Sequence, residues 1–343
     1  MNRPVETIGK KRDPRIDALK GVLILLVIFG HGLQYYVYKG NEGYWQDPVF
    51  TFIYIFHMPL FMAVSGYVAV YGLQGLKLRE LVLKRCLRFL LPIMFWCAAI
   101  VIADCLLRRM PDPLQFMQNY HAAIFHYYWF LWALAISSIL VWCALALQMR
   151  DALVLPVSAM LLLAMPFTSG ILVMAQYTYP FFCAGYLYHR YEAKLVPGLW
   201  AYLCSALIAV TCYAVWRPQT YVYNNHLRMS TLPDVQMVAI LFAGGAAFCV
   251  LVSGVLSYLW RLGPQGRIQG YCATLGKVTL ELYLLQIFLF RLAWALPLPR
   301  MQSYAANLAM NGVLTAAIVA LGVACIAATR RMGKLNLLIW GRT

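Results

Sequence analysis

Apolar segments long enough to cross a membrane alternate with short polar breaks along the whole chain. A membrane-spanning helix needs about 20 mainly apolar residues, because the hydrocarbon layer is about 30 Å thick and each helical residue rises about 1.5 Å. Scanned at that length, the sequence predicts an all-α integral membrane protein, a bundle of about ten transmembrane helices. The predicted spans cover residues 19–38, 49–73, 86–107, 123–147, 152–168, 171–188, 197–216, 234–258, 271–295 and 304–328.

The breaks between these spans are too short to hold another folded domain, and no internal repeat or low-complexity tract is present. The sequence therefore predicts a single transmembrane domain over residues 1–343, with residues 1–16 as an N-terminal segment and residues 329–343 as a C-terminal tail. The basic start and first apolar stretch are not followed by an A-x-A cleavage site, so we expect an uncleaved first helix rather than a signal peptide.

Composition agrees with a membrane protein, since 63% of the residues are hydrophobic and only 12% are charged. The net charge of +16 is distributed unevenly across the predicted bundle. Segments and helix ends on one side hold 21 of the 28 Lys and Arg residues, and the opposite side holds six. Because basic residues mark the cytoplasmic side, both termini are predicted to be cytoplasmic. The positive charge thus indicates how the protein is oriented in the membrane, where lipids are expected partners. No nucleic-acid partner is expected.

The ten cysteines are scattered, nearly all within predicted spans, and form no CxxC motif or metal-ligand spacing. They are typical of small buried apolar residues. We therefore expect no metal cofactor.

Ionisable side chains inside a membrane span cost about 2.5–3.5 kcal/mol or more at mid-depth, so each one is a candidate functional residue. Four places within the spans are selected on this ground, His31, His57, Glu281 and Arg291. Each also has a structural explanation. A histidine within the membrane often forms a hydrogen bond between two helices. Glu281 lies one turn after Lys277 and can form an ion pair with it. The side chain of Arg291 can extend to the outer interface.

Spacing gives the first span a functional face. Lys20 and His31 are three helical turns apart, so they share one face about 16 Å apart, and Asp17 falls near that face. His31 and His57 are both predicted to lie about 10–12 Å below the outer surface on consecutive antiparallel helices. An imidazole can take and give a proton near neutral pH, so the pair predicts an acid/base site.

A second cluster lies at the predicted cytoplasmic start of the third span. Lys84, Arg85 and Arg88 lie on one helical face, and such a face suits phosphate groups. The alternative is that these residues only orient the helix and contact anionic lipids.

Together these elements resemble acyltransferase family 3, the integral membrane acyltransferases that modify cell-envelope glycans and lipids. The first span matches that family's Arg-x10-His pattern in "RIDALKGVLILLVIFGH", with Lys20 in place of the arginine and His31 as the histidine. The second span carries its SG-[FY] element in "HMPLFMAVSGY", which includes Ser65 and Tyr67.

Three further elements resemble the family in the expected order. Arg85 and Arg88 match its Arg-x-x-Arg pattern. The segments "YYWFLWAL", with Trp129, and "LGKVTLELYLLQ", with Glu281, are also similar, although Gln286 stands where the family often has histidine.

The resemblance implies transfer of an acyl group, usually acetyl, from a coenzyme A thioester on the cytoplasmic side to a hydroxyl of a glycan or lipid-linked sugar. Acetyl-CoA is the expected donor, and His31 acts either as general base or as a transient acyl carrier. The expected catalytic residues are His31, His57 and Asp17. The expected donor-binding residues are Lys20, Lys84, Arg85 and Arg88. The expected substrate-binding residues are Ser65, Tyr67, Trp129 and Glu281. Ser65, Tyr67 or His57 would stabilise the oxyanion.

Two other functions fit the same pattern of spans and buried polar groups. One is a transporter or flippase for a lipid-linked sugar, and the other is a structural or regulatory membrane component. Dependence on acyl-CoA separates the acyltransferase from both. The outer connection from Arg217 to Asp234 has the aromatic and amide side chains of a sugar-contacting surface or of an ordinary amphipathic loop. The expected location is a bacterial inner membrane.

Overall fold

A computed structural model of the chain describes residues 12–39, 41–73, 77–108, 113–263, 266–329, 332–333 and 335–342, without the side chains of residues 84–87, 108 and 113. Within these ranges every regular element is helical and no strand occurs. The all-α class predicted from the sequence is therefore confirmed.

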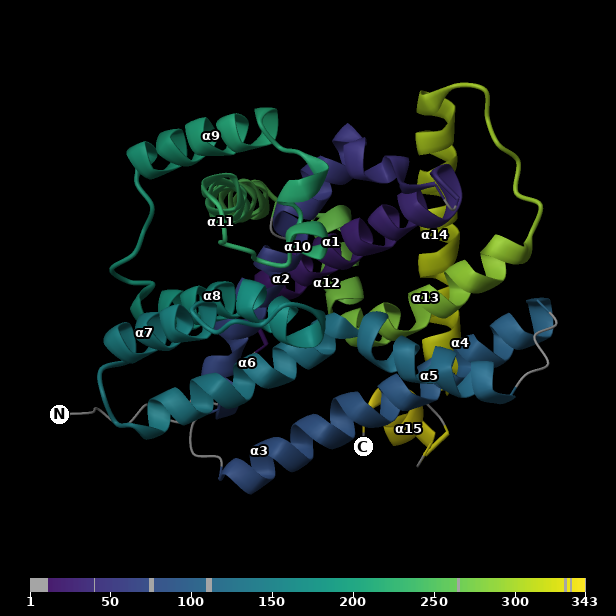
Figure 1. Cartoon of the computed structure of the whole chain (residues 1–343), viewed down its shortest axis with the longest axis horizontal. Helices are drawn as coiled ribbons and strands as arrows, with labels where there is room; N and C mark the ends of the chain where they lie inside the picture. The colour runs from purple at the N-terminus through teal and green to yellow at the C-terminus, as the bar shows by residue number, and fades with distance from the viewer. Residues whose placement is uncertain are drawn as a thin grey trace.

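Helices follow one another with short links throughout the chain (Figure 1). The first half contains α1 (Pro14–Gly32), η1 (Leu33–Val37), η2 (Glu42–Gln46), α2 (Pro48–Leu73), α3 (Leu78–Arg85), η3 (Cys86–Leu90), α4 (Leu91–Arg108), α5 (Pro113–His126), α6 (Trp129–Ala146) and α7 (Asp151–Leu163). The second half contains α8 (Gly170–Tyr191), α9 (Leu199–Ala214), η4 (Pro218–Thr220), α10 (Val222–Asn225), α11 (Leu232–Leu262), α12 (Arg267–Gly276), α13 (Thr279–Ala295), α14 (Tyr304–Thr329) and α15 (Leu335–Trp340).

Six helices within the described ranges are long and apolar enough to cross a membrane, or seven if the bent pair α12–α13 forms one span. Each of the ten predicted spans is largely helical, but α7 and α9 have only 13 and 16 residues. At about 1.5 Å per residue these two helices are about 20 and 24 Å long, shorter than a hydrocarbon core. Ten spans and cytoplasmic termini thus stay predictions.

Two predicted spans are broken in the structure. The segment predicted at 123–147 divides at Tyr127 and Tyr128 between α5 and α6. The segment predicted at 271–295 bends by 80° between α12 and α13. Averaged over about 20 residues, hydropathy does not reveal such breaks, because each interrupts the helix for only two residues, Tyr127–Tyr128 and Lys277–Val278.

Helix α1 lies near the centre of the bundle and contacts α2, α11, α12, α13 and α14 (Figure 1). Its contact with α12 is backbone against backbone. A Cβ added at Gly21 would overlap the carbonyl of Cys272, and one added at Gly276 would overlap the carbonyl of Asp17. Small residues allow this close approach. It fixes the position of α1 relative to the bend that starts α13.

The C-terminal helix α15 packs against α4 and η3, so the predicted tail is part of the folded domain (Figure 1). Trp340 is buried and donates through Nε1 to Thr329 Oγ1 at 2.8 Å. Trp96 of α4 donates to the carbonyl of Ile339 at 2.9 Å. These contacts hold Arg342 beside the start of α13, where it donates to the carbonyl of Lys277.

Candidate active site

His31 and His57 line one space of about 150 Å³, which we call the histidine cavity. Helices α1, α2 and α13 meet there with the α5–α6 link and α10. The cavity is lined by Val27, His31, Tyr35, Tyr54, His57, Met58, His126, Tyr127, Trp129, Tyr223, Tyr283 and Ile287. The structure thus brings His31 and His57 together, in line with their similar predicted depths, and it places Trp129 beside them.

Gln286 of α13 orients the His31 ring. His31 Nδ1 and Gln286 Oε1 are 3.2 Å apart. In this orientation of the amide the oxygen can only accept, so Nδ1 carries the proton and donates, and Nε2 keeps its lone pair. Two residues after His31 the helix widens into the π-helical turn η1, a deviation that is frequent at functional sites.

His57 is held in the same tautomer. Its Nδ1 donates to the carbonyl of Ile53 one turn earlier, at 2.9 Å, because a carbonyl oxygen only accepts. The His57 side chain is buried and packs against the ring of Tyr54, with centroids 4.5 Å apart. Each of the two histidines therefore retains an Nε2 lone pair that can accept a proton.

A second cavity of about 200 Å³, which we call the basic cavity, adjoins the histidine cavity. The two share Val27, Met58 and Tyr283 as lining residues. Three cationic side chains line the basic cavity, which are those of Lys20, Lys277 and Arg342. A cluster of cations beside an apolar passage suits a molecule with a phosphorylated end and a thin uncharged arm.

Glu281 also lines the basic cavity and is almost completely buried. Its carboxylate pairs with Arg342 at 2.5 Å, and Arg342 donates to the carbonyl of Lys277 at 2.8 Å. The partner anticipated from the sequence was the Lys277 side chain. The structure adds a close partner from the C-terminal segment, Arg342, because α15 folds back on α4.

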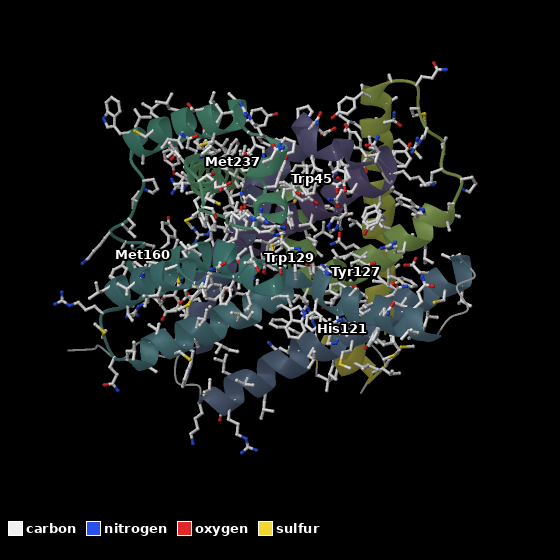
Figure 2. The ribbon with its side chains drawn as sticks, viewed as in Figure 1. Trp45, His121, Tyr127, Trp129, Met160 and Met237 are labelled. Atoms are coloured by element: carbon white, nitrogen blue, oxygen red, sulfur yellow. The ribbon has the colours of Figure 1, made fainter. Side chains whose placement is uncertain are left out.

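A third cavity of about 390 Å³, the aromatic cavity, lies on the other side of the histidines. It shares His31, Tyr54, His126, Trp129 and Tyr223 with the histidine cavity. Its remaining lining residues are Gln34, Trp45, Phe125, Gly170, Met174 and His226. Figure 2 shows Trp45 and Trp129 near the middle of the molecule. Aromatic rings with amide and imidazole groups between them are the chemistry that stacks on and hydrogen-bonds to sugars.

The other predicted site residues lie apart from the histidine cavity. Ser65 lines the basic cavity and donates to the carbonyl of Phe61 at 2.8 Å. Tyr67 lines none of the three cavities and donates to Glu192 at 2.8 Å. Asp17 is buried and pairs with Arg12.

The basic cluster of the third span is only partly described. The side chains of Lys84 and Arg85 lie outside the described part of the structure. Arg88 is exposed, and its neighbour Phe89 lines the basic cavity. The carbonyl of Arg88 lies against Gly341, directly before Arg342. Arg88 and the basic cavity are therefore adjacent.

The cavity residues His126 and Tyr283 and the His31 partner Gln286 were not selected from the sequence, whereas Tyr223 belongs to the outer connection for which the sequence left a sugar-contacting and an ordinary role open. His126 and Tyr223 lie in segments that the sequence assigns to a span and to a polar connection, and only the fold brings them beside His31. Burial raises the pKa of the Tyr223 phenol, so this hydroxyl keeps its proton at neutral pH and can donate. Gln286 was noticed only as a departure from a family pattern.

Arg291 has partners inside the bundle rather than at the interface. It donates to the Tyr127 hydroxyl at 2.5 Å and lies 3.7 Å from the carboxylate of Asp104. This cluster joins α13 to α4 and to the α5–α6 link beside the histidine cavity. Among the described residues, no group of three or more His, Cys, Asp or Glu side chains is arranged to hold a metal ion.

Comparison with known proteins gives one family and two close relatives. The family model described as "Acyltransferase domain" matches residues 13–329. A nodulation protein NolL of Mesorhizobium japonicum is 31% identical over 337 residues, which cover 96% of this chain and 90% of the relative. The nodulation protein NolL of Sinorhizobium fredii is 31% identical over 346 residues, which cover 97% and 93%. No solved structure matches the chain.

Proposed function

The chain belongs to the acyltransferase family whose model matches residues 13–329, and from this premise we propose that it moves an acyl group, acetyl in the first instance, from acyl-CoA to a hydroxyl of a cell-envelope glycan or lipid-linked sugar. The reaction takes place at His31. The proposed location is the inner membrane of a bacterium, with the donor on the cytoplasmic side.

One observation carries the proposal. The histidine cavity lies between a cavity lined by cations and a cavity lined by aromatic rings, and it shares lining residues with both. A donor and an acceptor of different chemistry can therefore approach His31 from two directions. This arrangement is what group transfer between unlike substrates requires.

The basic cavity is the proposed donor entrance. Lys20, Lys277 and Arg342 would bind the phosphates of coenzyme A, with the exposed Arg88 beside them. The uncharged pantetheine arm would pass between Val27 and Met58, because these apolar side chains line both cavities. The thioester would then reach the histidine cavity.

The chemistry follows from the tautomer of His31. As the acceptor oxygen attacks the thioester carbonyl, its proton passes to Nε2, whose lone pair is available. The C–S bond then breaks, and the coenzyme A thiolate takes the proton from the imidazolium. Tyr283 lines both cavities, so its hydroxyl would donate to the oxyanion that forms between them.

The aromatic cavity is the proposed acceptor site. Trp45, Trp129 and Tyr223 offer faces on which a sugar ring can stack, and Gln34 and His226 offer polar groups for its hydroxyls. His31 lines this cavity as well. An acceptor hydroxyl bound there would lie beside the proposed base.

The test is transfer of radiolabel from acetyl-CoA to cell-envelope glycans in membranes that contain wild type, His31→Ala or His121→Ala at matched protein levels. His121 is an exposed histidine on α5 that lines none of the three cavities, so its variant is the control. We expect His31→Ala to lose transfer by about 100-fold or more, as loss of a general base does, and His121→Ala to keep it. Equal transfer by His31→Ala would exclude the assigned site. Absence of label from wild type with every acyl-CoA supplied would exclude acyl-CoA as donor.

A further inference from the structure

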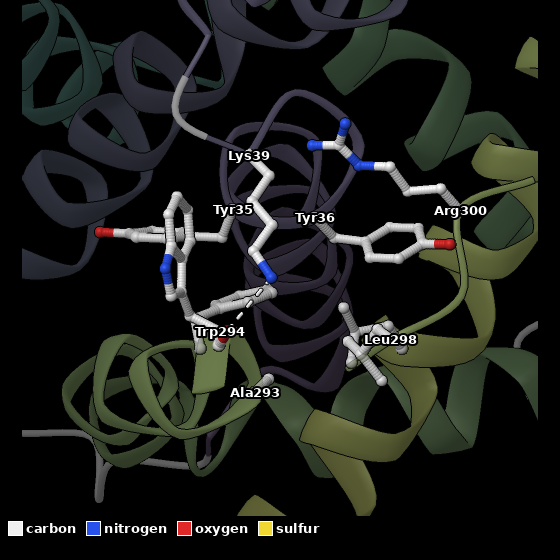
Figure 3. Close-up of a pocket in the computed structure, with 9 residues that line it drawn as sticks. Tyr35, Tyr36, Lys39, Ala293, Trp294, Leu298 and Arg300 are labelled. Carbon is white, nitrogen blue, oxygen red and sulfur yellow. Dashed lines mark hydrogen bonds between the residues drawn. The ribbon is translucent and has the colours of Figure 1, made fainter. Parts of the chain in front are cut away.

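A fourth cavity, of about 120 Å³, lies between η1, α13 and the link from α13 to α14, and we call it the Lys39 pocket (Figure 3). Two cations line it, Lys39 and Arg300, together with the aromatic rings of Tyr36 and Trp294. It is separate from the proposed donor and acceptor cavities. Among the described residues, Tyr35 is the one that lines both this pocket and the histidine cavity.

Hydrogen bonds hold the pocket in shape. The Tyr36 hydroxyl donates to the carbonyl of Pro299 at 2.6 Å, which ties η1 to the residue before Arg300. Lys39 Nζ donates to the carbonyl of Trp294 at 3.2 Å and lies 5.3 Å from the centroid of the Trp294 ring. Figure 3 shows this bond as a dashed line. An ammonium has three N–H donors, so two remain for a ligand.

The charge of the pocket is not balanced by the protein. Of the described residues that line it, none carries a carboxylate. Lys39 is partly exposed and Arg300 is exposed, and both line the same pocket, so an anion bound there would reduce the repulsion between the two cations. The predicted outer side of the membrane carries only six of the 28 Lys and Arg residues, and two of the six meet in this pocket.

The chemistry of the donors points to one class of ligand. The Arg300 guanidinium offers a planar fork and the Lys39 ammonium a point charge, and both are typical phosphate ligands. A phosphate group also suits the place, because the lipid headgroups of the membrane surface present phosphates to residues at the ends of spanning helices. The aromatic rings of the pocket are suited to this interfacial depth.

We propose that the Lys39 pocket binds a phosphate group at the outer membrane surface, either the headgroup of an anionic phospholipid or the phosphate of a lipid-linked sugar. The proposal does not depend on acyl transfer. A ligand here would lie one aromatic ring from the candidate base, since Tyr35 separates the pocket from His31, with ring centroids 6.3 Å apart.

The experiment uses the full chain in nanodiscs and follows its thermal unfolding by tryptophan fluorescence. In one arm the nanodiscs contain only phosphatidylcholine and inorganic diphosphate is titrated. In the other arm no diphosphate is added and phosphatidylglycerol replaces part of the phosphatidylcholine. The test variant is Lys39→Gln with Arg300→Gln. The control is Arg228→Gln, which removes one positive charge from the same predicted side at an exposed position outside the pocket.

We expect the anion to raise the Tm of wild type and of Arg228→Gln equally. The double variant should need at least about tenfold more anion for half of the same shift, because two charge-assisted bonds are lost. A response to phosphatidylglycerol alone identifies a headgroup as the ligand, and a response to diphosphate in neutral lipid identifies a carrier or soluble phosphate. Equal responses of wild type and double variant in both arms, or no response of wild type in either, would overturn the proposal.

A conservative variant guards against misfolding. Lys39→Arg with Arg300→Lys keeps both charges and should bind like wild type. If this variant responds like the double glutamine variant, the charge of the pocket is not what binds phosphate.

Discussion

His31 and Gln286 show how one neutral contact decides the chemistry of a residue. Because Gln286 Oε1 accepts from His31 Nδ1, the ring presents Nε2 to the cavity in the form that can take a proton. A histidine without this partner would divide between two tautomers and several ring orientations. Gln286 is thus a positioning residue, and it needs no charge of its own.

Gln286→Leu tests this role. The variant removes the acceptor at similar size, so we expect kcat for acyl transfer to fall about tenfold with KM for both substrates little changed. Gln286→His supplies a ring nitrogen that can accept from Nδ1, and it should restore most of the activity. Steady-state kinetics on purified protein would measure both. A rise in KM with unchanged kcat in Gln286→Leu would contradict the assignment.

At the scale of elements, the position of His31 depends on two glycines that let backbones touch. Gly21 and Gly276 bring α1 against α12, and α13 turns away immediately after that contact. Gly66 and Gly185 form the same kind of contact between α2 and α8. The helices that carry His31, His57 and Gln286 are therefore positioned by close packing of small residues.

Gly276→Ala should destabilise the protein. Its Cβ would overlap the carbonyl of Asp17, so α1 and α12 must separate, at a cost of about 1–3 kcal/mol. Gly270→Ala on the same helix is the control, because its Cβ would meet nothing within 4 Å. Thermal unfolding in detergent would compare them. We expect a lower Tm for Gly276→Ala and an unchanged or slightly higher Tm for Gly270→Ala. Similar values for the two variants would show that this contact does not limit stability.

At the scale of the whole molecule, three cavities lie in a row, with His31 and His57 at the middle one. The apolar residues Val27 and Met58 line both the histidine cavity and the basic cavity, so in the proposed mode of binding the phosphates stay at the cationic end while the uncharged arm passes between these side chains. The C-terminal segment completes the cationic end by supplying Arg342.

Lys277→Gln tests the cationic end as the donor entrance. Loss of one charge near the phosphates should raise KM for acetyl-CoA by roughly five- to tenfold and leave kcat unchanged, since the residue does not touch the reacting atoms. Lys194→Gln is the control, because Lys194 lies on the same predicted side and lines none of the cavities. Initial rates at varied acetyl-CoA would measure KM. An unchanged KM in Lys277→Gln, or an equal rise in Lys194→Gln, would place the donor elsewhere.

Local pattern was sufficient for the parts of this protein that depend on hydropathy and helical spacing. It predicted the all-helical class, helices in each apolar segment and the meeting of His31 with His57, because burial of apolar side chains and the rise of a helix are local properties. The motifs of the first, second, third, fourth and ninth spans also indicated the acyltransferase family that the comparison confirmed.

Contacts between distant segments needed the tertiary structure. The bend between α12 and α13, the return of α15 and the entry of Tyr223 and His126 into the cavity all depend on how helices pack, which hydropathy does not encode. The ion pair of Glu281 with Arg342 is the clearest example. Helical spacing pointed to Lys277, four residues away, whereas the fold brings Arg342 to that carboxylate from 61 positions further along the chain. Sequence determined which residues are costly to bury, and only packing decided which partners offset that cost.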